Sequence, residues 1–454
     1  MKRSLRFLSV LLCLLIVLPL APSAGADSSL LTPVRMAVSI GDGTEYTVRA
    51  YDVSYENNIY LSLGDLAAVL KNSEKRFTIE YRNTAQDGEH YAVTTGQAPA
   101  AEPFSGNDTR GTVWGEVRRN RLFVDKAEKR YYTVSSGNML YMSVLDIQLM
   151  LDIGIDAFPD NGLRIYPDQP FSADLQGLKK EGYFESFSSV LLGDAESGAI
   201  LFAGNPSTPV PIASTSKLMT YLLLAEAIRN GDVKTGDKVT ISKNAAALSR
   251  TADAMVVLTE GTKIPLEELV RTMLLASSNE CALAIAEHVA GSEREFVKSM
   301  NSRARELELK TARFYNPHGL PVYGETAVPA KLQNRMSAED MFRLSAYILK
   351  NFPQITAVTS LQYANMPNLR YTTANSNPLV FNMEGVNGLK TGSTNRAGYC
   401  LVASCPVTAG RETHTMIAIV YGAENPEERG QAAEILLRYA RAFCEENGFP
   451  KGWR

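Results

Sequence analysis

Hydrophobic and polar positions divide the chain into a short leader and two longer regions. The leader is an apolar run from Phe7 to Leu20. From about residue 33 to 167, a strand–helix–strand pattern occurs twice. From about residue 184, strand patterns give way to long helical ones and then return. A length of 454 residues is enough for two or three domains, each with its own core.

The first long region contains an internal repeat. The segment Ile59–Leu70 matches Leu140–Leu151 at a constant offset of 81 residues. In each copy a short strand meets a serine that is placed to cap the helix that follows. Each helix then leads to another strand, over 76–81 in the first copy and 162–166 in the second. The pattern predicts two related units that form one small α+β module.

The second long region predicts a sheet flanked by helices. Strands over 190–194 and 199–202 are joined by a turn, and a helix follows from about Ser214 through the apolar run Tyr221–Ile228. The order of strands, helices, strands and a final helix favours this α/β (α+β) architecture. The other predicted elements are turn-rich strands between 231 and 261, helices over 266–275, 280–289 and 293–307, strands over 399–404 and 414–421, and a closing helix over 426–446.

The leader reads as a secretory signal peptide. A basic start precedes the apolar run, and Ala24-Gly25-Ala26 provides small residues for cleavage. The run is short for a membrane span, although an uncleaved anchor stays open. We therefore expect a signal peptide over 1–26, a repeat domain over 27–168, a linker over 169–183 and a second domain over 184–450, in a secreted or extracytoplasmic protein.

Composition excludes several classes of function. A hydrophobic content of 45% and a charged content of 21% are typical of a soluble globular protein. The net charge of -3 gives no indication of a nucleic-acid partner. The four histidines lie far apart without ligand spacing, so we expect no metal and no cofactor. We expect buried free thiols at the four cysteines beyond the leader, Cys281, Cys400, Cys405 and Cys444.

One motif places a serine and a lysine before an apolar helix. Ser214 and Lys217 are three residues apart, so on a helix they share one face. A serine becomes a nucleophile when a base takes its proton, and lysine is such a base only if its pKa is lowered. The start of a buried helix supplies desolvation and a positive dipole end. Without further support, a helix cap with a solvated lysine explains the same motif.

A second motif, S-x-N, occurs six times and gains meaning only from its context. Ser277-Ser278-Asn279 follows the apolar run 272–276 and opens the next predicted helix. A buried loop there can direct the Ser277 hydroxyl and the Asn279 amide into a cleft. Simple helix capping is the competing interpretation.

The third motif, K-T-G, occurs twice. Lys234-Thr235-Gly236 lies in a polar turn next to Asp237, whose carboxylate would repel an anion. Lys390-Thr391-Gly392 precedes Ser393 and an apolar strand. A strand edge with lysine and threonine can bind a terminal carboxylate, and glycine allows close approach of the backbone. We therefore choose the second copy.

The ordered set S-x-x-K, S-x-N and K-T-G resembles the low-molecular-weight penicillin-binding proteins, the serine-type D-Ala-D-Ala carboxypeptidases. The resemblance covers residues from about 176 to 450 and implies a β-lactamase/transpeptidase-like fold with an antiparallel sheet. Further matching segments are Asp194–Gly198, Asn316–Leu320, Met336–Met341, Asn375-x-Asn377, Gly388–Gly392 and Ala397–Tyr399.

The resemblance implies catalytic roles for four residues. Ser214 would attack the peptide carbonyl between two D-alanines and form an acyl-enzyme, with Lys217 as the base. Ser277 and Asn279 would assist proton transfer and positioning. For His318, in the matching segment Asn316–Leu320, we expect a role in a structural turn rather than direct contact with substrate.

The resemblance also implies the binding residues and partners. Lys390 and Thr391, with Gly392 and Ser393, would hold the terminal carboxylate, and the Ser214 and Ser393 N–H groups would form an oxyanion hole. The substrates would be peptidoglycan stem peptides ending in D-Ala-D-Ala, with β-lactams as inhibitors. Membrane contact stays open, because the amphipathic tail that is frequent in the family is not evident.

The repeat module resembles the amine-oxidase N-terminal-like stalk domains of secreted bacterial proteins. It implies no oxidase activity, and we expect a spacer or wall-facing module. Two functional alternatives stay open for the second domain. A β-lactamase would need an efficient deacylating base, and no convincing Glu-x-x-x-Asn lies on a predicted loop before Lys390. A non-catalytic cell-wall-binding protein would not need all three motifs intact.

Overall fold

The computed structural model describes residues 28–450 except 42, 54–57, 85–87, 106–109, 117, 137–138, 158–161, 170, 172–174, 181 and 322–331. The chain divides into two compact units between Phe171 and Ser172. The predicted signal peptide, 1–26, lies outside the described residues.

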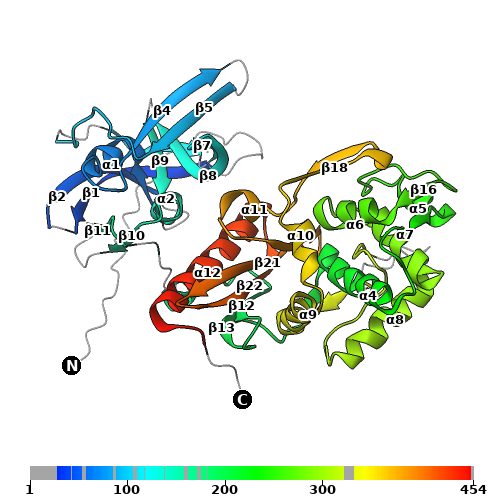
Figure 1. Ribbon diagram of the computed structural model, residues 1–454. Coiled ribbons are helices and arrows are strands. Elements are labelled where there is room, and N and C mark those ends of the chain that lie inside the picture. The colour runs from blue at the N-terminus through cyan, green and yellow to red at the C-terminus, as the bar shows by residue number, and fades with distance from the viewer. Residues whose placement is uncertain are drawn as a thin grey trace, which may run out of the picture. The chain divides into compact units, whose positions relative to one another are not determined.

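Unit 1 is a large mixed sheet with two short helices (Figure 1). Its strands are β1 Ser28–Ile40, β2 Glu45–Val53, β3 Asn58–Ser62, β4 Phe77–Thr84, β5 Gly88–Thr95, β6 Val113–Glu116, β7 Arg118–Val124, β8 Ala127–Ser136, β9 Met139–Ser143, β10 Gly154–Ala157 and β11 Gly162–Tyr166. Its helices are α1 Leu63–Val69 and α2 Val144–Leu151. The strand order is β10-β11-β1-β2-β3-β9-β8-β7-β5-β4, and β6 pairs with β1.

The predicted repeat is visible in the two strand–helix entries of unit 1. The Ser62 hydroxyl accepts the Asp65 backbone N–H at 3.3 Å, and the Ser143 hydroxyl accepts that of Asp146 at 3.0 Å. The two serines therefore cap α1 and α2, as predicted. Strands β3 and β9 pair antiparallel with each other, with Leu61 opposite Met142. The two copies thus meet at the middle of the sheet.

Unit 2 contains a five-stranded antiparallel sheet with the order β13-β12-β22-β21-β20. These strands are β12 Ser189–Asp194, β13 Ile200–Gly204, β20 Gly388–Thr394, β21 Gly398–Ala409 and β22 Glu412–Ala423. Three two-stranded sheets join β14 Val210–Pro211 to β17 Arg335–Met336, β15 Lys238–Thr240 to β16 Lys263–Pro265, and β18 Tyr363–Met366 to β19 Tyr371–Ala374. The predicted antiparallel sheet flanked by helices is confirmed.

The helices of unit 2 are α3 Leu175–Lys180, α4 Lys217–Asn230, α5 Lys243–Leu248, α6 Leu266–Leu275, α7 Asn279–Ala290, α8 Glu293–Glu306, α9 Ala338–Asn351, α10 Thr356–Thr359, α11 Leu379–Asn382 and α12 Pro426–Asn447. Five of these helices were predicted, namely α4, α6, α7, α8 and α12, and the others were not. Short 3₁₀ turns are η1 Ala213–Ser216, η2 Pro353–Ile355 and η3 Pro367–Leu369. Helix α5 lies where the sequence predicted only turn-rich strands, and Ser242 caps it by accepting the Ala245 N–H.

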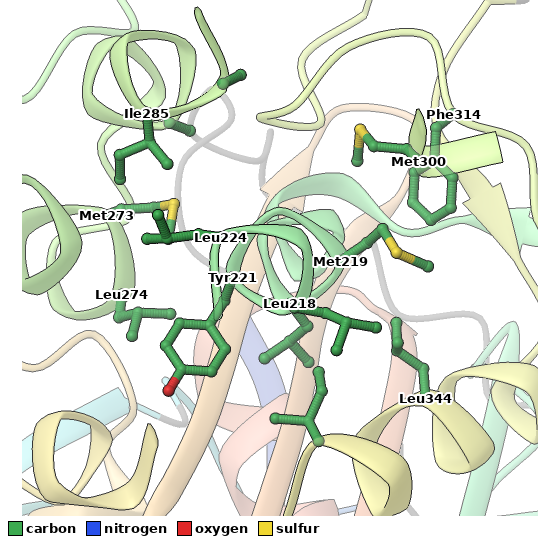
Figure 2. Packing of buried hydrophobic residues seen from close by; sticks show 14 of the residues in the cluster. Leu218, Met219, Tyr221, Leu224, Met273, Leu274, Ile285, Met300, Phe314 and Leu344 are labelled. Atoms are coloured by element: carbon green, nitrogen blue, oxygen red, sulfur yellow. The ribbon is translucent and has the colours of Figure 1, made fainter. Parts of the chain in front are cut away.

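Helix α4 forms the centre of the helical part of unit 2. Its apolar side chains Leu218, Met219 and Tyr221 are buried in a single large core. Figure 2 shows them with Leu224 among side chains from α6, α7, α8 and α9, including Met273, Leu274, Ile285, Met300 and Leu344. Strand β22 joins the same core through Ile417 and Ile419. Because this burial fixes α4, it fixes the residues at its N-terminal end.

The four cysteines beyond the leader are buried free thiols, as predicted. Within the described part of the chain, no helix combines the length and apolar character needed to cross a membrane.

Candidate active site

The 3₁₀ turn η1 carries Ser214 into the N-terminal end of α4. The sequence predicted an α-helix at this point, whereas the structure has a tighter turn before the helix begins at Lys217. Side chains three residues apart are eclipsed in a 3₁₀ turn. This geometry places Ser214 and Lys217 side by side, and Ser214 is half-buried.

Two glycines allow the backbone to pass close to this turn. Ala213 has a φ of 46°, which is unusual for a residue with a side chain. A Cβ at Gly319, whose φ is 94°, would lie 2.0 Å from the Ala213 carbonyl oxygen. A Cβ at Gly392 would lie 2.7 Å from the Ser214 nitrogen. Only glycine fits at these two positions, which lie on either side of the turn. Besides being part of strand β20, Gly392 therefore leaves room for the Ser214 backbone.

The Lys217 amine makes three contacts inside the protein. Its Nζ lies 2.7 Å from Ser214 Oγ, 2.8 Å from Asn279 Oδ1 and 2.8 Å from the His318 carbonyl oxygen. The amide and carbonyl oxygens can only accept hydrogen bonds. A neutral amine has two N–H groups and one lone pair, so donation to those two oxygens directs the lone pair at the Ser214 hydroxyl. This arrangement is what a general base for Ser214 requires.

Burial and charge favour the neutral form of Lys217. The residue is fully buried, and this burial, together with the positive charge of Lys390, lowers the pKa of Lys217 well below its usual value. The negative charge of Glu280 acts in the opposite direction and raises the pKa of Lys217.

The loop between α6 and α7 brings in the second motif. Ser277 has a φ of 65°, and Ser278 caps α7 by accepting the Cys281 N–H at 3.1 Å. The Asn279 amide binds Lys217 on one side and donates to the Asp253 carbonyl at 3.0 Å on the other. Helix capping was the competing interpretation of this motif, and it applies to Ser278 only. Asn279 contacts Lys217.

The segment Asn316–Leu320 forms another wall of the site. The Asn316 carboxamide oxygen accepts the N–H groups of His318 and Gly319, and its amide donates to the Leu320 carbonyl. Asn334, fully buried, donates to the Asn316 carbonyl at 2.8 Å. These bonds hold the His318 carbonyl against Lys217.

The His318 side chain faces the interior. Its Nδ1 accepts the Leu320 N–H at 3.2 Å, and the residue is 8% exposed. Burial and the positive charge of Lys217 lower the pKa of His318 to about 3, so the imidazole is neutral at physiological pH. The turn role favoured by the sequence agrees with these contacts, and the carbonyl contact to Lys217 was not predicted.

Strand β20 brings the third motif to the same place. Lys390 is 1% exposed and donates from Nζ to the Thr391 carbonyl at 2.9 Å. Burial and the charge of Arg429 lower the pKa of Lys390 to about 7. Gly392 lies against the Ser214 turn, and the Ser393 side chain that follows is exposed. All three motifs thus meet at one site.

Arg429 is a residue of this site that the sequence analysis missed. It lies near the start of α12, is 7% exposed, and places its guanidinium 5.9 Å from the centre of the Tyr399 ring. Burial lowers the pKa of Arg429 to about 10. The sequence did carry a signal for the burial of Arg429. This residue precedes the buried Ala432 and Ala433 by three and four positions, which places it on the apolar face of α12.

The other K-T-G copy lies elsewhere. Lys234 is exposed and donates its backbone N–H to the Asp237 carboxylate at 3.0 Å. This contact makes Lys234 part of a surface turn.

Among the described residues, one group has the proximity of metal ligands, and it lies outside the three motifs. It consists of Asp194, Glu196 and His414. His414 Nδ1 lies 2.7 Å from Asp194 Oδ2, and Ser197 donates to the same oxygen. These contacts explain the grouping, and the absence of a metal from the reaction stays a prediction.

Comparison with known proteins identifies the family. Residues 183–425 match the family model of peptidase S11, D-alanyl-D-alanine carboxypeptidase, and the chain belongs to this family. D-alanyl-D-alanine carboxypeptidase DacF of Bacillus subtilis is 34% identical over 259 residues, which cover 56% of this chain and 62% of the relative. DacD of Escherichia coli is 32% identical over 257 residues, with the same shares. The chain thus spans about 62% of the length of these curated relatives.

Solved structures show the same fold. A peptidoglycan synthesis regulatory factor (PBP3) from Streptococcus pneumoniae has a TM-score of 0.52 and 29% identity, covering 57% of this chain and 72% of that one. Penicillin binding protein 5 from Haemophilus influenzae has a TM-score of 0.51 and 30% identity, covering 57% and 71%. The fold class predicted from the sequence is confirmed.

Proposed function

We propose that this protein is a serine-type D-Ala-D-Ala carboxypeptidase that shortens peptidoglycan stem peptides through an acyl-enzyme at Ser214. The observation that carries the proposal is the Lys217 amine, which lies 2.7 Å from Ser214 Oγ and is held by two acceptors that cannot take its lone pair. The domain over 184–450 would be the catalytic one. The repeat domain over 27–168 would act as a spacer or wall-facing module.

The acylation step follows from these contacts. Lys217 takes the Ser214 proton, and Oγ forms a bond to the carbonyl carbon of the penultimate D-alanine. The carbonyl oxygen gains negative charge, and the N–H groups of Ser214 and Ser393 would stabilise it. The proton then passes to the leaving D-alanine nitrogen, and Ser277, two residues before Asn279, would relay it. Cleavage of the C–N bond releases D-alanine.

Deacylation completes the cycle. Water attacks the ester carbonyl after Lys217 takes one of its protons, and Ser214 leaves with a proton returned by the lysine. The products are the shortened peptide and free enzyme. A β-lactam would acylate Ser214 in the same way, but its leaving group remains attached and so no fragment departs.

The positive charges suit an anionic substrate end. Lys390 and Arg429 are both buried and lie close enough for the charge of one to lower the pKa of the other. Two desolvated cations with a neighbouring threonine hydroxyl, Thr391, fit a terminal carboxylate. The family name and this charge distribution support peptides ending in D-Ala-D-Ala as partners. Such substrates place the reaction outside the cytoplasm.

Intact-mass spectrometry with benzylpenicillin tests the proposal, with Ser214→Ala as the matched variant. We expect a stable one-to-one adduct in the wild-type protein that is lost in the variant, and release of D-alanine from an acylated D-Ala-D-Ala peptide. An intact antibiotic without adduct would exclude an activated Ser214 and favour the wall-binding alternative. Rapid hydrolysis of the antibiotic without adduct would indicate a β-lactamase.

A further inference from the structure

Ser376 links the two sides of the site and belongs to none of the three motifs. Its Oγ lies 2.6 Å from Thr391 Oγ1 in β20. Its backbone N–H donates at 3.1 Å to the carbonyl of Leu275, the last residue of α6. Leu275 is two residues before Ser277, so Ser376 bridges the α6–α7 loop and the strand that carries Lys390.

The two asparagines around Ser376 hold its backbone in place. The Asn375 amide donates to the carbonyls of Thr359 and Leu361, both at 2.9 Å. The Asn377 amide donates to the Gly388 carbonyl at 2.8 Å, and its N–H donates to Asn375 Oδ1. The side-chain amides of both asparagines therefore bind backbone carbonyls of neighbouring segments. The side chain between them is the one that contacts Thr391.

A hydroxyl carries a single proton, which decides what Ser376 can do. A carboxylate accepts hydrogen bonds and cannot donate one. If Thr391 holds a terminal carboxylate, its proton must point to that carboxylate. The 2.6 Å contact then requires Ser376 to donate and Thr391 Oγ1 to accept.

We propose that Ser376 is a positioning residue that donates to Thr391 Oγ1 and so turns the Thr391 proton toward the terminal carboxylate of the substrate. The inference rests on the proposed function. The chain Ser376–Thr391–carboxylate is a run of hydrogen bonds in one direction, in which each bond polarises the next. Because the carboxylate itself takes no part in bond making or breaking, we expect the main effect on substrate binding.

Steady-state kinetics with an acylated peptide ending in D-Ala-D-Ala test this role. Ser376→Ala should raise KM about five- to tenfold, the size of one net hydrogen bond, with kcat changed less than about twofold. Ser376→Thr, which keeps the hydroxyl, should restore KM. Ser376→Cys fills almost the same volume with a weak donor, so it should behave like the alanine variant even if that variant folds poorly.

A double-mutant cycle separates action through Thr391 from a general structural role. In a Thr391→Val background, Ser376→Ala should have no further effect on KM. An effect of unchanged size in that background would overturn the proposal. Thr372→Ala is the matched control, because Thr372 is an exposed residue on β19 whose hydroxyl contacts Asn365.

The outcomes distinguish this inference from the function on which it rests. A wild-type protein that neither releases D-alanine nor forms an adduct would overturn both. An active wild-type protein with a wild-type KM in Ser376→Ala and Ser376→Cys would overturn the role of Ser376 alone.

Discussion

Raising the pH should weaken recognition of the substrate carboxylate through the charge of Lys390. Burial and Arg429 lower the pKa of Lys390 to about 7 from an ordinary 10.5. A lysine with a lowered pKa is protonated below that value and neutral above it. A bound carboxylate stabilises the protonated form and so raises the pKa of Lys390 in the complex. Binding is therefore strongest below pH 7 and weakens as the pH rises.

The size of the effect follows from the two pKa values. If the carboxylate restores the pKa of Lys390 fully, the affinity falls tenfold for each pH unit above 7, about 1.4 kcal/mol per unit. Because half of the Lys390 amines are already neutral at pH 7, the limit between pH 7 and pH 9 is about fiftyfold. Arg429, whose pKa is about 10, stays charged over this range, and its attraction for the carboxylate persists. The loss of affinity therefore stays below this limit, and we expect a loss of about tenfold to fiftyfold.

The assay is the second-order rate constant for acylation by benzylpenicillin from pH 5.5 to pH 9.5. The wild-type rate should fall on the alkaline side with a slope approaching one, and Lys390→Arg, which stays charged, should flatten that fall even if its overall rate is low. Lys234→Arg, in the exposed K-T-G copy, is the matched control and should leave the profile unchanged. An equally steep alkaline fall in Lys390→Arg, or no fall in the wild-type protein, would refute the reasoning.

Further substitutions probe the turn, the charge balance and the repeat. Gly319→Ala pushes a methyl group into the backbone before Ser214 and should slow acylation about a hundredfold, while Gly291→Ala, equally left-handed but in open space, should not. Glu280→Gln keeps an oxygen that can accept the backbone N–H groups of the neighbouring loop, but it removes a negative charge. The pKa of Lys217 should then fall, and the acid side of the pH profile of acylation should move to lower pH. A profile that does not move would exclude an influence of Glu280 on the pKa of Lys217. Ser62→Ala and Ser143→Ala each remove one helix cap, and each should lower the free energy of unfolding by about 1 kcal/mol in urea titrations. If one substitution lowered this free energy several times more than the other, the two caps would not be equivalent.

Local sequence signals predicted several of the long helices of unit 2. Helix α6 begins and ends where its apolar pattern does, and α7 and α8 follow within one or two residues. The same holds for the caps of α1 and α2, because a capping serine acts on a residue three positions away. Most strands of unit 1 were not predicted, because a strand such as β7 is stabilised by partners β5 and β8 that the local pattern does not show.

In the candidate site, too, contacts between residues close in sequence were predicted and contacts between distant residues were not. Ser214 and Lys217 share a turn, so spacing alone predicts that they are neighbours. The contacts that give the site its chemistry join distant residues, as the His318 carbonyl does with Lys217 across 101 positions. Backbone carbonyls carry no side-chain signal, so no motif search could find this one. Ser376 was not predicted because the partner of its side chain, Thr391, belongs to a different element.

The junction between β3 and β9 has the symmetry of a homodimer interface. Equivalent residues of the two copies differ by 81 in number, so Tyr60 corresponds to Tyr141 and Ser62 to Ser143. The pair Tyr60–Ser143 is therefore equivalent to the pair Tyr141–Ser62, and Leu61 pairs with its own counterpart, Met142. Two copies of one surface thus meet around a twofold axis, as identical subunits do. A fragment with a single copy would expose the edge that its twin now covers. The module therefore has the form expected if two self-associating chains were once fused into one.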